Sequence, residues 1–264
     1  RKTVFDPSEL GSQNFGYNVP IRDNLEGLVK LARAKSNITL VFGIGLQRVV
    51  QDDKSVFGIL TDGTTIEAKL IIGADGGNSQ VRKSLRIGVK KKYTGQTALS
   101  FHITHEKPHF NISTEIYSDG GPLTLVPMRR KNKEHGSAVV WMQDTEKASF
   151  MANNDSDLFL NHLQEKSCDT LGKILSCSAI SSRPVTVQLA NRIIDRRVVL
   201  LGEAAHLLPP IGAQGYNSSI KDIKVLSHAV LESQNDPGAS AALKKYRSLR
   251  LPDIYLRTAG VGTL

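Results

Sequence analysis

Hydrophobic and polar residues alternate along this chain with two periods, which distinguish helices from strands. Residues 23–36 follow the helical period, with an apolar face made of Leu25, Leu28, Val29 and Ala32. Residues 38–50 and 55–61 are rich in β-branched and apolar residues and predict two strands. DGTT at 62–65 predicts the turn that follows them.

Two later apolar runs predict buried strands of the parallel type. They are Leu70–Ile72 and RRVVLLG at 196–202, and each leads through glycines into a helix. The first of these helices is expected to start near Asn78 or Ser79. The second spans 217–233, with one face formed by Ile220, Ile223, Ser227 and Val230. A last helix at 239–250 is expected to end before Pro252.

The hydrophobic pattern changes between about residues 93 and 188. Strand-like pieces joined by polar loops predict a mainly antiparallel sheet, with a polar helix at roughly 155–175. Because α/β pieces flank this region on both sides, one domain is expected to be inserted into another. The predicted fold class is α/β (α+β), with boundaries 1–92, 93–188 and 189–264.

Composition agrees with a globular protein, since 40% of the residues are hydrophobic and 22% are charged. Cys168 and Cys177 lack metal-ligand spacing, so reduced thiols and no metal site are expected. No apolar run nears the ~20 residues of a membrane span, and no signal peptide is expected. From these features a cytoplasmic location is expected. The start at Arg1 and the end on TAGVGTL are interpreted as cuts through a larger protein.

The formal charge of +9 bears on partners. The short clusters of basic residues at 90–92 and 129–131 lack interleaved aromatic residues. Solvated loops are the favoured interpretation, weak attraction to anionic lipid comes second, and nucleic-acid binding comes last. No nucleic-acid partner is therefore expected.

Three glycine-containing segments are candidates for a ligand site. GIGLQR at 43–48 is rejected as a dinucleotide fingerprint, because Arg48 stands where the third glycine belongs and no helix is expected next. In LIIGADGGNSQVRKSL at 70–85, Asp75 can accept hydrogen bonds from ligand hydroxyls, and Arg82 can hold a phosphate or orient Asp75. A tight turn with an aspartate cap and a surface arginine explains that pattern equally well.

The third segment, GEAAHLLPPIGAQGYN at 202–217, has the same order of buried strand, acid, glycines and helix. Gly212 and Gly215 would let a planar ligand approach the backbone and the helix N-terminus. Pro209 and Pro210 stiffen the approach, and Glu203 can bind hydroxyls. For Glu203 a salt bridge, and for His206 an ordinary loop position, are the alternatives. No nucleophile accompanies His206, so no catalytic triad is indicated.

Together these two segments resemble motifs of the FAD-dependent aromatic-ring monooxygenases of the p-hydroxybenzoate hydroxylase type. ADGGNSQVR is similar to the family's ADGxxSxxR motif, and GEAAHLLPPIGAQGYN to its GDAAHxxxPxxGQGxN motif. GYNVP, HEKPH, GPLTLVP and AVVW, in that order, resemble the ubiquinone-biosynthesis hydroxylase branch. The resemblance covers nearly the whole chain and implies a partial FAD-binding Rossmann-like domain with an inserted substrate domain.

The resemblance also implies roles for individual residues. Glu203, with Gly202 beside it, would bond the ribityl chain of FAD, where the family usually has Asp. The isoalloxazine ring would be lined by Pro209, Gly212, Ala213, Gln214, Gly215 and Asn217. Asp75, Gly76 and Arg82 would serve the pyrophosphate side and transient NAD(P)H, and Arg22 is a weaker candidate. Because the flavin carries the chemistry, no side chain need be catalytic.

The activity that the resemblance implies is hydroxylation of a phenolic ring on a polyprenylated ubiquinone precursor. NAD(P)H would reduce FAD, and O2 would form a flavin C4a-hydroperoxide. Peripheral contact with the inner membrane and a complex with other ubiquinone-pathway enzymes are implied as well. Two alternatives stay open: a hydroxylase of a small soluble aromatic such as salicylate, and a flavin-free binding or assembly protein.

The chain differs from the family in lacking an N-terminal unit that would bind the adenosine half of FAD. The family begins with a GxGxxG-bearing βαβ unit and an acidic residue for the adenosine ribose, and the 264 residues contain neither. The chain alone is therefore expected to bind FAD poorly and to be inactive.

Overall fold

The computed structural model describes residues 2–118, 120–129, 134–153, 156–233 and 236–260. The chain divides into two compact units. The first comprises Arg1–Phe42, Leu99–Trp141 and Met151–Ser181, and the second comprises Gly43–Ala98, Met142–Phe150 and Ser182–Leu264. The mixed α/β class with antiparallel sheets is confirmed. The predicted boundaries lie within strands β5 (Val89–His105) and β10 (Ser181–Ala190), and the division into domains stays a prediction.

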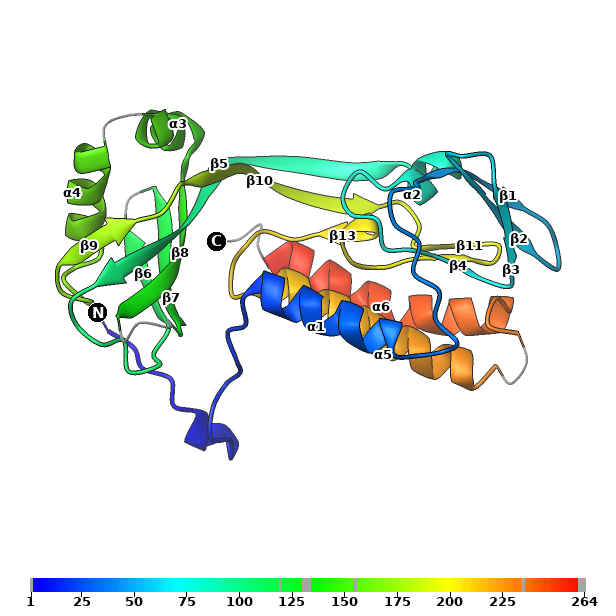
Figure 1. Ribbon diagram of the computed structural model, residues 1–264, viewed down its shortest axis with the longest axis horizontal. Helices are drawn as coiled ribbons and strands as arrows, with labels where there is room; N and C mark the ends of the chain where they lie inside the picture. The colour runs from blue at the N-terminus through cyan, green and yellow to red at the C-terminus, as the bar shows by residue number, and fades with distance from the viewer. Residues whose placement is uncertain (1, 119, 130–133, 154–155, 234–235, 261–264) are drawn as a thin grey trace. The chain divides into compact units, whose positions relative to one another are not determined.

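The first unit combines helices with an antiparallel sheet. It opens with a 3-10 turn, η1 (Pro7–Leu10), and helix α1 (Ile21–Arg33). Strands β6 (Thr114–Ser118), β7 (Gly121–Met128) and β8 (His135–Asp144) pair in sequence order, and β9 (Ile174–Cys177) pairs with β5. Helix α4 (Ser156–Lys166) lies beside β9 (Figure 1) and supplies Phe159, whose ring centroid is 5.2 Å from that of Phe101 and 6.0 Å from that of Trp141.

Two small sheets form much of the second unit. The antiparallel sheet contains β1 (Leu46–Gln51), β2 (Val56–Leu60) and β3 (Thr65–Ala68). In the other sheet β4 (Ile71–Gly73) runs parallel to β12 (Val198–Leu200), and β12 pairs antiparallel with β11 (Ile194–Asp195). The parallel pairing of β4 with β12 brings two segments that are more than a hundred positions apart to one sheet edge.

The remaining elements of the second unit connect and cover these sheets. They are α2 (Gln80–Ser84), α3 (Thr145–Asn153, which ends in the first unit), the 3-10 turn η2 (Gly202–Ala204), β13 (His206–Leu207), α5 (Gln214–Leu231) and α6 (Ser240–Gly260). Strand β13 pairs with β10, and helices α5 and α6 lie side by side (Figure 1). Among the described residues no helix has the length and hydropathy to cross a bilayer.

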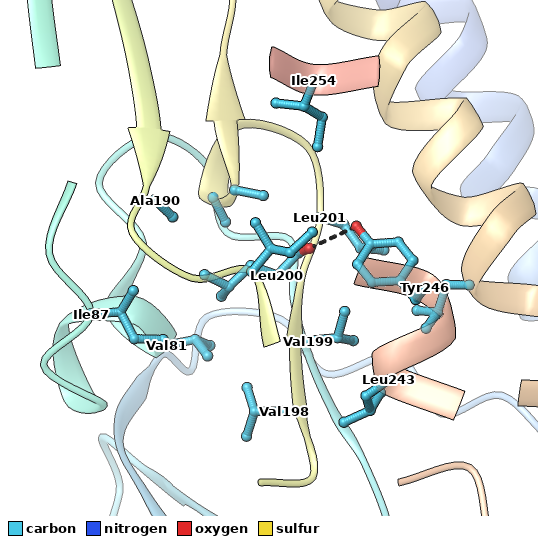
Figure 2. Packing of buried hydrophobic residues seen from close by; sticks show 14 of the residues in the cluster. Val81, Ile87, Ala190, Val198, Val199, Leu200, Leu201, Leu243, Tyr246 and Ile254 are labelled. Carbon is cyan, nitrogen blue, oxygen red and sulfur yellow. Dashed lines mark hydrogen bonds between the residues drawn. The ribbon is translucent and has the colours of Figure 1, made fainter. Parts of the chain in front are cut away.

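The core of the second unit is packed around strand β12 (Figure 2). Val198, Val199 and Leu200 are at most 1% exposed, because helix α6 covers them with Leu243 and Tyr246. The Tyr246 hydroxyl donates to the Leu200 carbonyl oxygen over 3.0 Å, so its polar atom is satisfied inside the core. Burial raises the pKa of Tyr246, with Asp222 adding to the shift and Arg250 opposing it.

Gly73 ends β4 at a position without room for a side chain. A Cβ there would lie 2.8 Å from Cδ2 of Leu200 and 3.0 Å from Cβ of Val81. We expect Gly73→Ala to lower the free energy of unfolding by about 1–3 kcal/mol through overpacking, as measured by urea denaturation. Gly77→Ala is the control, since its Cβ would meet nothing within 4 Å. Equal losses in both variants would contradict this explanation.

Three sequence predictions of local structure are wrong. Residues 38–45 are not a strand, and β1 begins only at Leu46, because the antiparallel ladder with β2 pairs residues 46–51 alone. The polar helix expected at 155–175 ends at Lys166. Helix α6 continues through Pro252 to Gly260 instead of stopping before it. Ion pairs made by Arg250, Asp253 and Arg257 hold α6 on both sides of the proline, which offsets the helix-breaking cost of about 3 kcal/mol.

The buried face of α5 is not the one that contains Ile220, Ile223, Ser227 and Val230. Ile220 and Ile223 are 46% and 53% exposed, and the residues turned inward are Ser218, Asp222, Leu226 and Ala229. Three donors satisfy the Asp222 carboxylate, so a charged side chain can occupy the buried face.

Candidate cofactor-binding site

The two motif segments leave the sheet side by side. Gly73 at the end of β4 pairs with Leu200 at the end of β12, and the Leu201 N–H donates to the Gly73 carbonyl over 2.9 Å. Because both strands are parallel, the loops that follow them emerge from the same edge, at the carboxyl ends where α/β sheets bind ligands. The predicted position of both loops at strand ends is therefore confirmed by the pairing.

The carboxylate of Asp75 binds backbone N–H groups within the first loop. The Asp75 Oδ2 atom accepts from the N–H groups of Gln80 and Val81 over 2.6 and 3.1 Å, and the Ser79 side chain accepts from the Arg82 N–H over 3.0 Å. Ser79 is the N-cap of α2, as the sequence predicts. Asp75 is exposed and lies next to Gly76, which has a φ of +78°. The aspartate cap that the sequence offered as an alternative is thus present.

Arg82 is buried and bridges the two loops. One nitrogen, Nη1, donates to the Ala204 carbonyl over 2.8 Å, and the other, Nη2, donates to the Gly77 carbonyl over 2.6 Å. The residue is only 5% exposed, so the surface position considered for it is wrong. Burial lowers the pKa of the Arg82 guanidinium, while the Asp75 carboxylate opposes that shift. Arg82 therefore fixes the first loop against η2 of the second.

The second loop turns sharply at Gly202. Its φ is +54°, and a Cβ there would lie 2.9 Å from the Ser219 Oγ, so only glycine fits. Glu203 follows and is exposed, whereas His206 and Pro209 are buried. Gly212 and Ala213 both have left-handed φ, +59° and +52°, and turn the chain into α5.

The start of α5 is open towards solvent. Its N-cap, Ala213, makes no side-chain cap hydrogen bond, and the first turn contains no acidic residue. The Asn217 side chain donates back to the Ala213 carbonyl over 3.0 Å. A Cβ at Gly215 would meet nothing within 4 Å. Packing within the described residues therefore does not require glycine at 215, and the helix N-terminus keeps its partial positive charge accessible.

An ion network that the sequence patterns did not indicate lies behind the second loop. Asp222 accepts from the Gly202 N–H over 2.9 Å, from His206 Nε2 over 2.7 Å and from Arg250 Nε over 2.6 Å. Burial by itself raises the pKa of Asp222, but the hydrogen bonds from His206, Gly202 and Arg250 outweigh burial and hold that pKa below its usual value. Asp222 stands between Lys221 and Ile223 in a mixed stretch of the helix, so the local sequence carries no signal for this network.

The predicted site residues fall into two groups. Those of both loops, from Asp75 to Arg82 and from Gly202 to Asn217, belong to the second unit and are joined through Arg82. Arg22 belongs to the first unit, where it lies on α1 and pairs with Glu26 over 2.8 Å.

A separate hollow of about 560 Å³ lies in the first unit, lined partly by His105, Glu106 and His135. Both ring nitrogens of His105 are engaged, at 2.8 Å by the Lys107 carbonyl and at 3.0 Å by the Ser137 hydroxyl. Burial lowers the pKa of His105, so its ring favours the neutral form. Within the described ranges no group of three His, Cys, Asp or Glu side chains could hold a metal ion.

Two glycine-bearing turns at the ends of neighbouring parallel strands, each leading into a helix, are the arrangement in which α/β proteins typically bind nucleotides. Comparison with known families identifies the family to which this fold belongs. The chain belongs to the FAD binding domain family, whose model matches residues 7–255.

The chain is similar in sequence to two relatives and in fold to a solved structure. The chain is 33% identical over 235 residues to ubiquinone hydroxylase UbiL of Rhodospirillum rubrum, covering 88% of this chain and 54% of UbiL. It is 25% identical over 261 residues to the Escherichia coli 3-demethoxyubiquinol 3-hydroxylase, covering 98% of this chain and 66% of that enzyme. The fold is similar to PqsL, a probable FAD-dependent monooxygenase from Pseudomonas aeruginosa, with a TM-score of 0.75 and 21% identity, covering 89% of this chain and 66% of PqsL.

The resemblance to FAD-dependent monooxygenases, and to their ubiquinone-hydroxylase branch, is thus confirmed. The chain spans between about half and two thirds of the length of these relatives.

Proposed function

We propose that the chain is part of an FAD-dependent monooxygenase that hydroxylates the phenolic ring of a polyprenylated ubiquinone precursor, using NAD(P)H and O2. The observation that carries this proposal is the meeting of the two motif loops at one sheet edge, tied together by Arg82. Similarity to ubiquinone hydroxylases over most of the chain supports the substrate class.

The residues present fit a flavin. Gly215 leaves open space where any other residue would carry a Cβ, and Gly212 is exposed beside it. A planar ring could therefore approach the backbone there, and the uncapped N-terminus of α5 would favour the negative charge of reduced flavin. Bound FAD would supply the electron transfer and the oxygen activation.

The chain's own residues would bind and orient the cofactor. Glu203, exposed after the Gly202 turn, would accept hydrogen bonds from the ribityl hydroxyls. The ring would lie against Pro209 and the segment made of Gly212, Ala213, Gln214, Gly215 and Asn217. Asp75, Gly76 and Arg82 would serve the pyrophosphate side and NAD(P)H, with Arg82 acting through the loops that it joins. Arg22 stays a weaker proposal.

The partners follow from the proposed substrate. A prenylated phenol partitions into lipid, so we propose peripheral contact with the inner membrane from the cytoplasmic side, and association with other enzymes of the pathway. The formal charge of +9 supports attraction to an anionic surface.

Gly215→Leu tests the position of the ring. We expect FAD affinity to fall at least tenfold, because the new side chain fills the space proposed for the flavin, while the unfolding temperature of the apoprotein is unchanged. Fluorescence titration with FAD and thermal denaturation measure the two quantities. Gly27→Leu on α1, which is equally free of neighbours, is the control. Unchanged affinity in Gly215→Leu would contradict the proposed ring position.

The whole proposal is tested on the product of the complete gene that contains this sequence, beside the 264-residue chain. We expect the gene product to bind FAD and to add one oxygen atom to a prenylated phenol while consuming NADH or NADPH. The 264-residue chain alone should bind FAD weakly. Turnover of a soluble phenol such as salicylate, and not of the prenylated one, would favour the alternative hydroxylase. Absence of flavin in the gene product, even with FAD added, would overturn the proposal.

A further inference from the structure

We propose that Arg257 on α6 is a positioning residue, which orients the side-chain amide of Gln214 so that its N–H donors face the flavin. The inference rests on the proposed function, since it concerns the same site. It adds a residue from a different helix that no motif includes.

The contact between the two side chains fixes which way the amide points. Arg257 Nη1 donates to Gln214 Oε1 over 2.5 Å. Because a guanidinium has donors and no acceptor, the atom facing it must be the amide oxygen. The amide nitrogen is then held at the opposite end. It lies 3.9 Å from the position that a Cβ would take on Gly212, at the exposed glycine turn that leads into α5. The amide N–H donors are therefore presented where the flavin ring is proposed to lie.

Arg257 is itself held in place by a carboxylate. Its Nε donates to Asp253 Oδ2 over 3.1 Å, and Asp253 also accepts from Arg250 over 2.6 Å and from Lys221 over 3.0 Å. Burial raises the pKa of Asp253, but the hydrogen bonds from Arg257, Arg250 and Lys221 outweigh burial and hold that pKa far below its usual range. The hydrogen bond from Arg257 Nε to this carboxylate restricts the orientation of the guanidinium.

The other end of this network reaches the second motif loop. Arg250 is fully buried and joins Asp253 to Asp222, whose other oxygen accepts from Gly202 and His206. One continuous chain of charged contacts thus runs from the Gly202 turn to Gln214, the first residue of α5. Residues of α6 therefore connect, through this network, to both sides of the proposed flavin site.

A purely structural role for Arg257, fastening α6 to α5, is the competing explanation. Lys221 provides a matched comparison, because it also pairs with Asp253 from α5 and carries one positive charge. Among the described residues, no hydrogen bond joins Lys221 to Gln214. A structural role predicts similar behaviour for the two cations, whereas a positioning role predicts that only Arg257 acts through Gln214.

The test is a double-mutant cycle on the product of the complete gene, read out as the dissociation constant for FAD and the unfolding temperature of the apoprotein. We expect Arg257→Met and Gln214→Ala each to weaken FAD binding about tenfold, as for the loss of one hydrogen bond. The double variant should be no weaker than Gln214→Ala alone, because Arg257 acts only through the amide. Lys221→Met should change affinity less than twofold while changing the unfolding temperature as much as Arg257→Met does.

Two results would overturn the inference alone: a double variant weakened about a hundredfold, which means independent effects, or an Arg257→Met variant that binds FAD as Lys221→Met does. If the unsubstituted protein binds no FAD at all, the proposed function itself fails, so the two failures are distinguishable.

Discussion

Asp222→Asn is expected to lower the free energy of unfolding by about 3 kcal/mol at neutral pH. The carboxylate is fully buried and neutralises the equally buried Arg250 while accepting from Gly202 and His206. An asparagine amide has the same shape but carries no charge, and one of its two polar atoms is a donor facing donors. Among the residues that the structure describes, the partly exposed Asp253 is then the one ionic partner left to Arg250. Urea denaturation of both proteins measures the loss.

Asp53→Asn is the control for this prediction. Asp53 also pairs with an arginine, Arg196, over 2.9 Å, but its side chain is 87% exposed. Water screens that pair, so the loss should stay below about 0.5 kcal/mol. Comparable losses of unfolding free energy in the two variants would mean that burial of the Asp222 network adds nothing to stability.

The difference between the wild-type protein and Asp222→Asn should also depend on pH in one direction. Since the folded state holds the pKa of Asp222 below the ordinary value, the stabilisation is complete above the unfolded-state pKa of about 3.9. It is lost as pH falls from there through the folded-state pKa. The gap in unfolding free energy should therefore be constant above about pH 5 and shrink in more acidic solution.

Arg82→Met is expected to lower the free energy of unfolding by about 2–3 kcal/mol and to weaken FAD binding. The substitution leaves the Ala204 carbonyl without the hydrogen bond that Arg82 donates to it and separates the two motif loops. The Gly77 carbonyl keeps a second donor, Gln188 Nε2 at 3.0 Å, which limits the cost. Urea denaturation gives the stability, and FAD titration of the complete gene product gives the affinity.

Lys83→Met, the neighbouring exposed cation on α2, should change the stability by less than about 0.5 kcal/mol. If Arg82 instead acted only as a surface contact for phosphate, Arg82→Met would weaken FAD binding and leave the apoprotein as stable as before.

Local pattern was enough to predict the elements that carry the site. Val198–Leu200 are apolar because both faces of β12 are covered, as the sequence predicts, whereas Ile72 of β4 is 49% exposed, so the prediction of a fully buried strand holds for β12 alone. The glycines mark where the chain turns. The helix start was predicted near Asn78 or Ser79, and Ser79 is the N-cap of α2. These features depend on a few adjacent residues, so a single sequence contains them.

What sequence pattern missed depends on contacts between distant residues. The sequence analysis did not single out Asp222, whose burial is made favourable by partners 20, 16 and 28 positions away. Ile220 and Ile223, which the sequence placed together on one face, are exposed, since the buried face contains Asp222 instead. Arg82 was expected at the surface or on a ligand, and its main partner, Ala204, is 122 positions along the chain. No periodicity in a single sequence encodes such pairings.

The alternating charges of Asp222, Arg250, Asp253 and Arg257 also constrain how this sequence can change over evolutionary time. A charge lost at one of these positions leaves its neighbour unbalanced, so substitutions there are tolerated mainly as compensated pairs. Positions on α5 and α6 that look unrelated in any one sequence should therefore change together among descendants of a common ancestor. A lineage that has replaced Arg257 should have altered Asp253 or Gln214 as well.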